Sequence, residues 1–171
     1  MENNKDSANE DKDLLKTEPV KVVLADDDKD DQEIFTDALT ETNIPADLTM
    51  VDNGQELIDH LKDPEEPNPD IIFLDINMPG KNGKEVLAEI KRDEEFKDIP
   101  TVMLSTSEHV KDVEESFNAG ANLYVQKPYS FKSFTRLLAK IFSFHWTGAL
   151  LKPFRKTFLM SEKNITETGT E

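Results

Sequence analysis

Short apolar runs alternate with amphipathic stretches between Val20 and Phe142, and this alternation constrains the fold more than any other feature of the sequence. Runs rich in Val, Ile and Leu are typical of strands that are buried on both faces. The pattern predicts repeated βα units, and therefore an α/β fold with a parallel sheet covered by helices on both faces. The five runs expected to be strands are Val20–Ala25, Ala46–Val51, Ile71–Leu74, Thr101–Leu104 and Leu123–Gln126.

Each predicted strand is followed by a stretch with apolar residues at helical spacing. Chain breakers separate these stretches: a loop with three prolines, 63–69, follows the second, and Gly120 ends the fourth, because glycine adopts the left-handed conformation of a helix end. We therefore expect five helices, each with one face buried. The residues expected on these faces are Ile34, Phe35, Ala38 and Leu39; Leu57, Ile58 and Leu61; Val86, Leu87 and Ile90; Val110, Val113 and Phe117; and Phe131, Phe134, Leu137, Leu138, Ile141 and Phe142.

Composition narrows the class of protein. With 171 residues and 36% hydrophobic content, the chain has room for one domain with a sizeable core and tails. A net charge of -16 opposes binding to nucleic acid and to anionic membranes, and favours divalent cations or basic partners. The chain has no cysteine, which excludes disulfides and thiolate metal sites, and residues 1–6 lack the apolar core of a signal peptide. We expect a cytoplasmic protein.

The polarity of the two ends divides the chain into four segments. Residues 1–18 have too few apolar side chains to offset the entropy of ordering, so we expect a disordered acidic tail. Residues 19–144 carry the βα pattern and form the domain. An apolar and basic C-terminal extension, 145–160, follows the domain, and a second disordered tail, 161–171, follows the extension.

The extension has aromatic residues, including Trp146, Phe154 and Phe158, beside basic ones in an acidic protein. Something must cover these aromatics. Docking on the domain's own acidic surface is the favoured arrangement, and a dimer contact is the sharper hypothesis. A basic amphipathic membrane segment comes third, because the overall charge of the chain opposes it.

Polar side chains stand at the carboxyl ends of four predicted strands: Asp26 and Asp27, Asp75, Ser105 and Lys127. In a doubly wound sheet these strand ends share one edge, where ligands bind. Carboxylates within 4 Å of each other repel by about 4 kcal/mol per pair at an effective dielectric constant near 20. Mg²⁺ relieves such repulsion and prefers oxygen ligands. The pattern therefore predicts a magnesium site that handles phosphoryl groups.

Taken singly, each of these residues has an ordinary explanation. The run Asp26–Asp28 caps a helix in the simplest interpretation, and Asp75 and Ser105 are then turn residues. Lys127 alone is then a solvated surface cation. Their coincidence at successive strand ends is what favours a functional site.

Ordered motifs surround these residues. They are Val22–Asp28, Leu74–Gly80 with Gly83, Val102–Ser105 and Gly120–Pro128. Over about Val20 to Phe142 the chain resembles the receiver domain of bacterial two-component response regulators. The resemblance implies a flavodoxin-like, three-layer fold with a doubly wound five-stranded parallel sheet in the order 2-1-3-4-5 and five helices.

By this resemblance, Asp75 is the phosphoacceptor, which takes a phosphoryl group from a phosphohistidine of a sensor histidine kinase or a histidine phosphotransfer protein. Asp26 and Asp27 hold Mg²⁺ together with Asp75, and the backbone carbonyl of Asn77 completes the metal shell. Lys127 pairs with a phosphoryl oxygen, which spreads the charge of the transition state.

The resemblance also implies a switch. Ser105 matches the hydroxyl that turns toward the phosphoryl group, and Tyr124 matches the aromatic residue whose rotamer follows. The Lys127–Pro128 peptide bond corresponds to a position that is commonly cis. Thr106 departs from the small residue usual after the switch hydroxyl, so we expect slow reaction with small phosphodonors.

The expected output is a protein contact. Only about thirty residues follow the fifth helix, and they show no second core, so the chain resembles a stand-alone receiver. Its partner is either a downstream protein target or another histidine in a phosphorelay. The signal is expected on the face formed by the fourth helix, fifth strand and fifth helix, and a homodimer would use this face or the extension.

Two other functions compete with this interpretation. A magnesium-dependent phosphohydrolase of the haloacid dehalogenase type needs a second acid two residues after its nucleophile, where this chain has Asn77. A receiver-like binding module that acts without phosphorylation would usually lack one of the acids or the lysine, and this chain keeps them all. We therefore rank the phosphoacceptor first, the binding module second and the hydrolase last.

Overall fold

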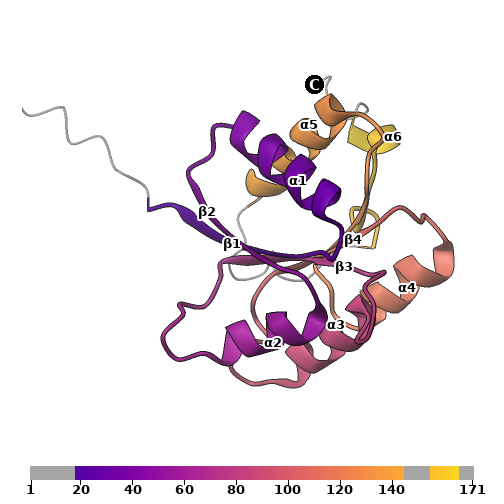
Figure 1. Ribbon diagram of the computed structural model, residues 1–171. Helices are drawn as coiled ribbons and strands as arrows, with labels where there is room; N and C mark the ends of the chain where they lie inside the picture. Colours follow the sequence, from indigo (N-terminus) through magenta and orange to yellow (C-terminus); the bar gives the residue numbers. More distant parts are fainter. Residues whose placement is uncertain (1–17, 145–154, 166–171) are drawn as a thin grey trace, which may run out of the picture.

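A parallel β-sheet runs through the centre of the structure, a computed structural model that describes residues 18–144 and 155–165 (Figure 1). The sheet has six strands in the order β2-β1-β3-β4-β5-β6. The strands are β1 (Val20–Ala25), β2 (Ala46–Val51), β3 (Ile71–Asp75), β4 (Thr101–Ser105), β5 (Leu123–Gln126) and β6 (Leu159–Met160). The helices are α1 (Lys29–Glu41), α2 (Gly54–Lys62), α3 (Gly83–Arg92), α4 (Val110–Asn118), α5 (Phe131–Phe142) and α6 (Glu162–Ile165).

The helices form two layers, one on each face of the sheet. Helices α1 and α5 cover one face, and α2, α3 and α4 cover the other (Figure 1). Because side chains alternate along a strand, Val22 and Leu24 of β1 pack into the core beneath α1 and α5, whereas Val23 and Ala25 pack with α2 and α3. The predicted three-layer, flavodoxin-like fold and the strand order 2-1-3-4-5 are confirmed.

Two central strands extend one residue further than predicted. Asp75 is the last residue of β3 and Ser105 is the last residue of β4, and every residue of both strands is buried. The polar groups therefore lie at the end of the ladder itself, where the backbone is held by neighbouring strands.

Strand β6 was not predicted. It pairs in parallel with β5, with Tyr124 opposite Leu159, and the Tyr124 N–H donates to the Phe158 carbonyl oxygen at 2.8 Å. The Phe158 side chain is buried and its ring meets that of Phe117 edge-on at 5.1 Å. Arg155 forms an ion pair with Glu114 of α4 at 3.1 Å.

Residues 155–160 of the extension therefore dock on the domain itself, as the favoured arrangement predicts. Residues 145–154, with Trp146 and Phe154, lie outside the described residues. Within 18–144 and 155–165, no helix is long and apolar enough to span a membrane. The dimer contact stays a prediction.

The second tail begins later than expected. Residues 161–165 were predicted to be disordered, but Ser161 is buried and α6 follows it. The Asn164 side chain explains this, because its Oδ1 accepts from the Ser161 N–H at 2.8 Å and its Nδ2 donates to the Leu159 carbonyl oxygen at 2.7 Å. Ile165 packs against the core beneath α5.

Three residues predicted to face the core are exposed: Ile34, Val110 and Phe131. Val110 and Phe131 are the first residues of α4 and α5, and both lie at the exposed ends of these helices. Ile34 lies about 100° around α1 from the buried Phe35.

Candidate functional site

The strand register brings the predicted site residues to one edge of the sheet. The pairing of β1 with β3 ends immediately before Asp26 and Asp75, so these two acids lie on neighbouring strands. On the other side of β3, Asp75 pairs with Leu104, which places Ser105 one step further along β4. The Lys127 N–H donates to the Ser105 carbonyl oxygen at 2.8 Å, so the lysine follows β5 at the same edge.

Three carboxylates converge at this edge. Oxygen atoms of Asp26, Asp27 and Asp75 all lie within 4.8 Å of one another. Asp26 and Asp75 are buried, whereas Asp27 is exposed at the mouth of the site. Such a set fits Mg²⁺, which takes hard oxygen ligands and usually keeps several waters, and the open side at Asp27 leaves room for them. Asn77 lies in the loop after β3 with its side chain exposed.

Lys127 lies among the acids. Its Nζ atom is 2.9 Å from Asp26 Oδ2, 3.2 Å from Asp75 Oδ1 and 2.7 Å from Asp31 Oδ2. The Lys127–Pro128 peptide bond is trans, contrary to the expectation from the resemblance. The lysine side chain reaches the acids from this trans backbone.

Asp31 was missed by the sequence analysis. It stands in the first turn of α1, where an acid is explained by the helix dipole alone. The available signal was that two more acids, Asp30 and Asp31, follow Lys29 in the turn of α1 nearest the strand ends. Asp28 makes that turn, because its side chain accepts hydrogen bonds from the N–H groups of Asp30 and Asp31. The capping explanation thus holds for Asp28, while Asp26 and Asp27 face the site.

The electrostatics of the site favour a bound cation. Burial first, and then the charges of Asp26 and Asp27, raise the pKa of Asp75 to about 6 against the lowering effect of Lys127. Burial also raises the pKa of Asp26, although Lys127 opposes it. Burial would lower the pKa of Lys127, but its carboxylate partners, with Asp31 first, outweigh burial and raise it. One ammonium faces three carboxylates, those of Asp26, Asp31 and Asp75.

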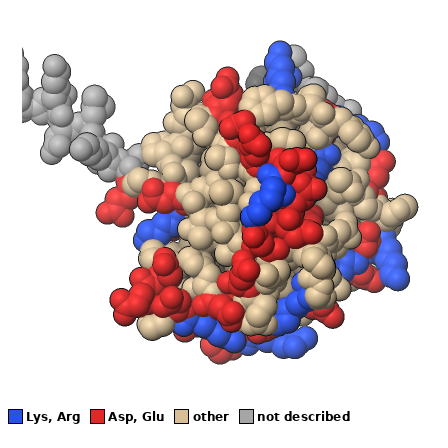
Figure 2. Space-filling model, viewed as in Figure 1, with Lys and Arg blue, Asp and Glu red and all other residues tan. Residues whose placement is uncertain are grey.

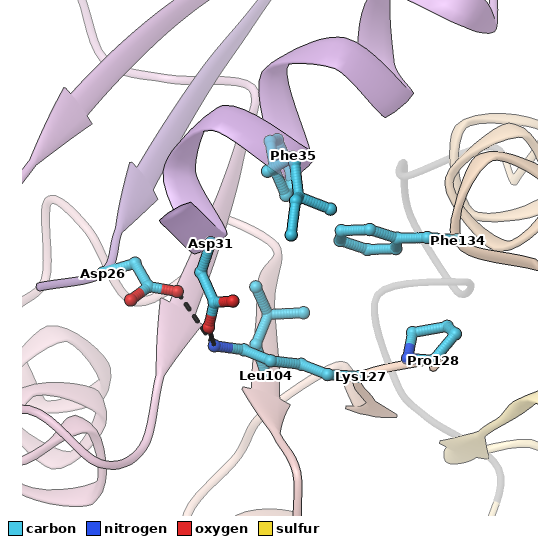
Figure 3. Close-up of a pocket in the computed structure, with 8 residues that line it drawn as sticks. Asp26, Asp31, Phe35, Leu104, Lys127, Pro128 and Phe134 are labelled. Atoms are coloured by element: carbon cyan, nitrogen blue, oxygen red, sulfur yellow. Dashed lines mark hydrogen bonds and ion pairs between the residues drawn. The ribbon is translucent and has the colours of Figure 1, made fainter. Parts of the chain in front are cut away.

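The surface around the site is acidic. Figure 2 shows Asp and Glu side chains in a band across this face, with basic side chains lying within it. A small cavity of about 60 Å³ opens beside Lys127 between α1 and the start of α5 (Figure 3). Asp26, Asp31 and Lys127 form its polar wall, and Phe35 and Phe134 are among its apolar lining.

Gly83 packs directly against the backbone of Asp75 and Ile76. A Cβ atom at Gly83 would lie 2.3 Å from the Asp75 carbonyl oxygen and 2.8 Å from Ile76 Cα, both closer than real contacts allow. The Gly83 N–H donates to the Ile76 carbonyl oxygen at 3.0 Å. Only glycine therefore lets α3 begin against the end of β3.

The two predicted switch residues meet at one loop residue. Ser105 Oγ accepts from the Ser107 N–H at 3.1 Å, and the Tyr124 hydroxyl donates to the Ser107 carbonyl oxygen at 2.8 Å. Ser105 and Tyr124 are both buried. A change at the Ser105 hydroxyl thus has a short path to the ring of Tyr124.

Comparisons with known proteins decide the family. The family model of the response regulator receiver domain matches residues 22–142. This chain belongs to that family. The response regulator Rcp1 of Synechocystis sp. is 34% identical over 139 residues, which are 79% of this chain and 94% of Rcp1.

Solved structures agree with this assignment. The phosphorylated cyanobacterial phytochrome response regulator RcpA is 34% identical with a TM-score of 0.66, over 72% of this chain and 91% of that one. The Mn²⁺-bound form of response regulator Rcp1 is 33% identical with a TM-score of 0.67, over 74% of this chain and 94% of that one.

The receiver domain is thus a phosphoacceptor of two-component signal transduction and not a metabolic enzyme. Receiver domains bind Mg²⁺ or Mn²⁺ in an acidic pocket, and they interact with histidine kinases and downstream targets. The cluster of Asp26, Asp27 and Asp75 has the composition of such a pocket. The hydrolase alternative is excluded by the family, and a receiver that acts without phosphorylation is not favoured.

Proposed function

We propose that Asp75 of this receiver domain accepts a phosphoryl group from a phosphohistidine. A carboxylate oxygen of Asp75 attacks phosphorus, the bond between phosphorus and the imidazole nitrogen breaks, and an acyl phosphate remains on Asp75. The observation that carries this proposal is the position of the Lys127 ammonium, 3.2 Å from Asp75 Oδ1 within a cluster of buried acids. Asp26 is buried as well and lies 2.9 Å from the same ammonium, so the site combines two buried carboxylates with one cation.

Asp26, Asp27, Asp75 and the carbonyl of Asn77 would hold the magnesium ion. When bound, the ion supplies positive charge that stabilises the transferring phosphoryl oxygens and favours the ionised form of Asp75. Lys127 holds a second positive charge beside Asp75, where the phosphoryl oxygens develop negative charge. Because Asp75 is buried, bulk water is largely excluded from its carboxylate.

The proposed switch starts at Ser105. Its hydroxyl exchanges the Ser107 N–H for a phosphoryl oxygen, and the loop 105–109 then shifts. Tyr124 follows, because its hydroxyl is bound to Ser107. The phosphoryl group biases the equilibrium because it makes this contact in only one of the two states.

Exposed apolar side chains offer a docking surface for the phosphoryl donor. Ile34 lines the cavity beside Lys127, Tyr129 follows Pro128 in the loop before α5, and Phe131 begins α5. The proposed donor is a sensor histidine kinase or a histidine phosphotransfer protein in the cytoplasm. RcpA is described as a phytochrome response regulator, so a light-regulated kinase is one donor to test.

The proposed output is a contact with a downstream protein or with a second copy of this chain. Strand β6 covers the edge of β5 between α4 and α5, so residues 155–160 form part of the surface that a partner meets on this side. Sedimentation with and without phosphorylation tests the homodimer. The mass of a monomer in both states would leave a downstream protein or another histidine as the partner.

Phosphorylation is tested by intact mass after incubation with Mg²⁺ and acetyl phosphate, and with a panel of phosphorylated histidine kinases. We expect a gain of one phosphoryl group that disappears in Asp75→Asn and persists in Asp47→Asn, an exposed acid on β2. Thr106→Ala should react faster with acetyl phosphate, because the smaller side chain opens access to the site. A wild-type chain that no donor labels would overturn the proposed function.

A further inference from the structure

Asp31 makes the shortest of the three ion pairs to Lys127. Its Oδ2 atom is 2.7 Å from Nζ, compared with 2.9 Å for Asp26 and 3.2 Å for Asp75. Figure 3 shows the Asp31 carboxylate reaching from the first turn of α1 to the lysine amine, beside that of Asp26. The side chain of Lys127 is only 15% exposed, so this pair is partly shielded from water.

Asp31 stands apart from the three carboxylates that converge on one point. That cluster consists of Asp26, Asp27 and Asp75. A cation held there engages the charges of Asp26 and Asp75, and so weakens two of the three attractions that hold the lysine. Asp31, in the first turn of α1, is the ion-pair partner of Lys127 that remains.

The backbone of α1 holds Asp31 in place independently of its side chain. Its N–H donates to Asp28 Oδ1 at 3.2 Å, and the neighbouring Asp30 N–H donates to the same oxygen at 2.9 Å. A substitution of the Asp31 side chain therefore leaves the helix cap intact. The carboxylate is free to act on Lys127 alone.

We propose that Asp31 is a positioning residue for phosphoryl transfer, which holds the Lys127 ammonium beside Asp75 while the metal occupies the other acids. The inference rests on the proposed function of Asp75 and Lys127. A lysine has a long flexible stem, so an ammonium without an anchor samples many positions. Loss of the anchor should slow the reaction, because fewer encounters find the amine in the productive position.

The first test measures the phosphorylation rate at saturating Mg²⁺ over a range of acetyl phosphate concentrations. Asp31→Asn should lower the maximal rate by about threefold to tenfold and leave the half-saturating donor concentration unchanged, because it alters positioning and not donor binding. Asp30→Asn is the matched control: it removes the same charge from the same turn, but Asp30 is exposed and lies outside the contacts of Lys127. Equal rates for the two variants would refute the inference.

A double-mutant cycle shows whether Asp31 acts through the lysine. In a Lys127→Gln background, Asp31→Asn should change the residual rate by less than about twofold, because no ammonium is left to position. Asp31→Glu should restore part of the rate, because its carboxylate reaches the same amine. Full additivity of the two single changes would contradict a positioning role.

A third measurement needs neither metal nor phosphodonor. The ammonium protons of Lys127 should give a slowly exchanging NMR signal in the wild type, since three carboxylates hold them. Asp31→Asn should broaden that signal and Asp30→Asn should not. An unchanged signal in Asp31→Asn would refute the role of Asp31 alone, whereas a wild type that no donor phosphorylates would refute the function of Asp75 as well.

Discussion

The hydroxyl of Tyr124 donates a hydrogen bond to the carbonyl oxygen of Ser107 at 2.8 Å and ties β5 to the loop after β4. Ser107 continues the connection, because its Oγ donates to Asp112 Oδ2 at 3.3 Å. Asp112 in turn pairs with Lys84 of α3 at 2.6 Å. The position of α4 is therefore linked both to the Tyr124 ring and to the helix that begins behind Asp75.

Tyr124→Phe should destabilise the domain by about 1 kcal/mol, because the hydrogen bond to Ser107 is lost while the ring stays buried. The change is measured as a shift of the urea unfolding midpoint. Tyr129→Phe is the control, since Tyr129 is 92% exposed, and it should leave the midpoint unchanged. Equal effects of the two substitutions would show that the Ser107 contact contributes nothing.

Mg²⁺ should stabilise the folded state, because it relieves the repulsion among Asp26, Asp27 and Asp75. At about 100 times its dissociation constant the ion should add about 2.7 kcal/mol to the free energy of unfolding. Thermal unfolding with Mg²⁺ and with chelator measures the difference. Asp27→Asn should remove most of it.

Asp28→Asn is the control for this prediction. Asp28 lies next to the cluster but caps α1, and asparagine caps a helix equally well. This variant should keep the stabilisation by Mg²⁺. An equal loss of Mg²⁺ stabilisation in both variants would mean that the ion binds through the overall negative charge of this surface and not through the cluster of Asp26, Asp27 and Asp75.

The central part of the fold could be predicted because the sequence signal there is local. Ile71–Leu74 and Thr101–Leu104 are continuous apolar runs, and burial on both faces is what such runs require. The position of the site could be predicted from the same signal. A carboxylate that comes directly after a buried run, such as Asp75, lies at the carboxyl edge of the sheet.

Other features depend on tertiary contacts that no local pattern encodes. Strand β6 has two residues, too few for any periodicity, and its place depends on how Phe158 fits beside Phe117. Asp31 has the local environment of any acid in a first helical turn. Its role becomes visible only when β5 brings Lys127 to it from nearly one hundred residues away.

Lys91 should give the domain a stability that rises with pH above about 8. Its amine donates to the carbonyl oxygens of Lys97 and Ile99, and burial lowers its pKa to about 8, with only Asp98 opposing. The folded state therefore releases this proton at a lower pH than the unfolded state, whose lysine pKa is 10.5. Between these values the unfolded state binds more protons, so a rise in pH favours folding.

The measurement compares urea midpoints of wild type and Lys91→Met from pH 7 to 10.5. The urea midpoint of the wild type should rise relative to that of Lys91→Met as the pH rises above about 8. Below about pH 8 the difference in midpoint should be constant, because Lys91 is charged in both the folded and the unfolded state. Lys62→Met, at an exposed lysine of α2, controls for the titration of other groups. Parallel curves for wild type and Lys91→Met would contradict the prediction.

Phe158→Ala should detach β6 from the sheet. The side chain is 2% exposed, so its truncation should cost about 3 kcal/mol of the free energy of unfolding, as is usual for a buried phenylalanine. Phe131→Ala, at a residue that is 47% exposed, should cost much less. Hydrogen exchange gives a local measurement, because the Tyr124 N–H donates to the Phe158 carbonyl oxygen and should lose its protection in Phe158→Ala. Retained protection of that amide would show that the backbone pairing of β6 holds without the Phe158 side chain.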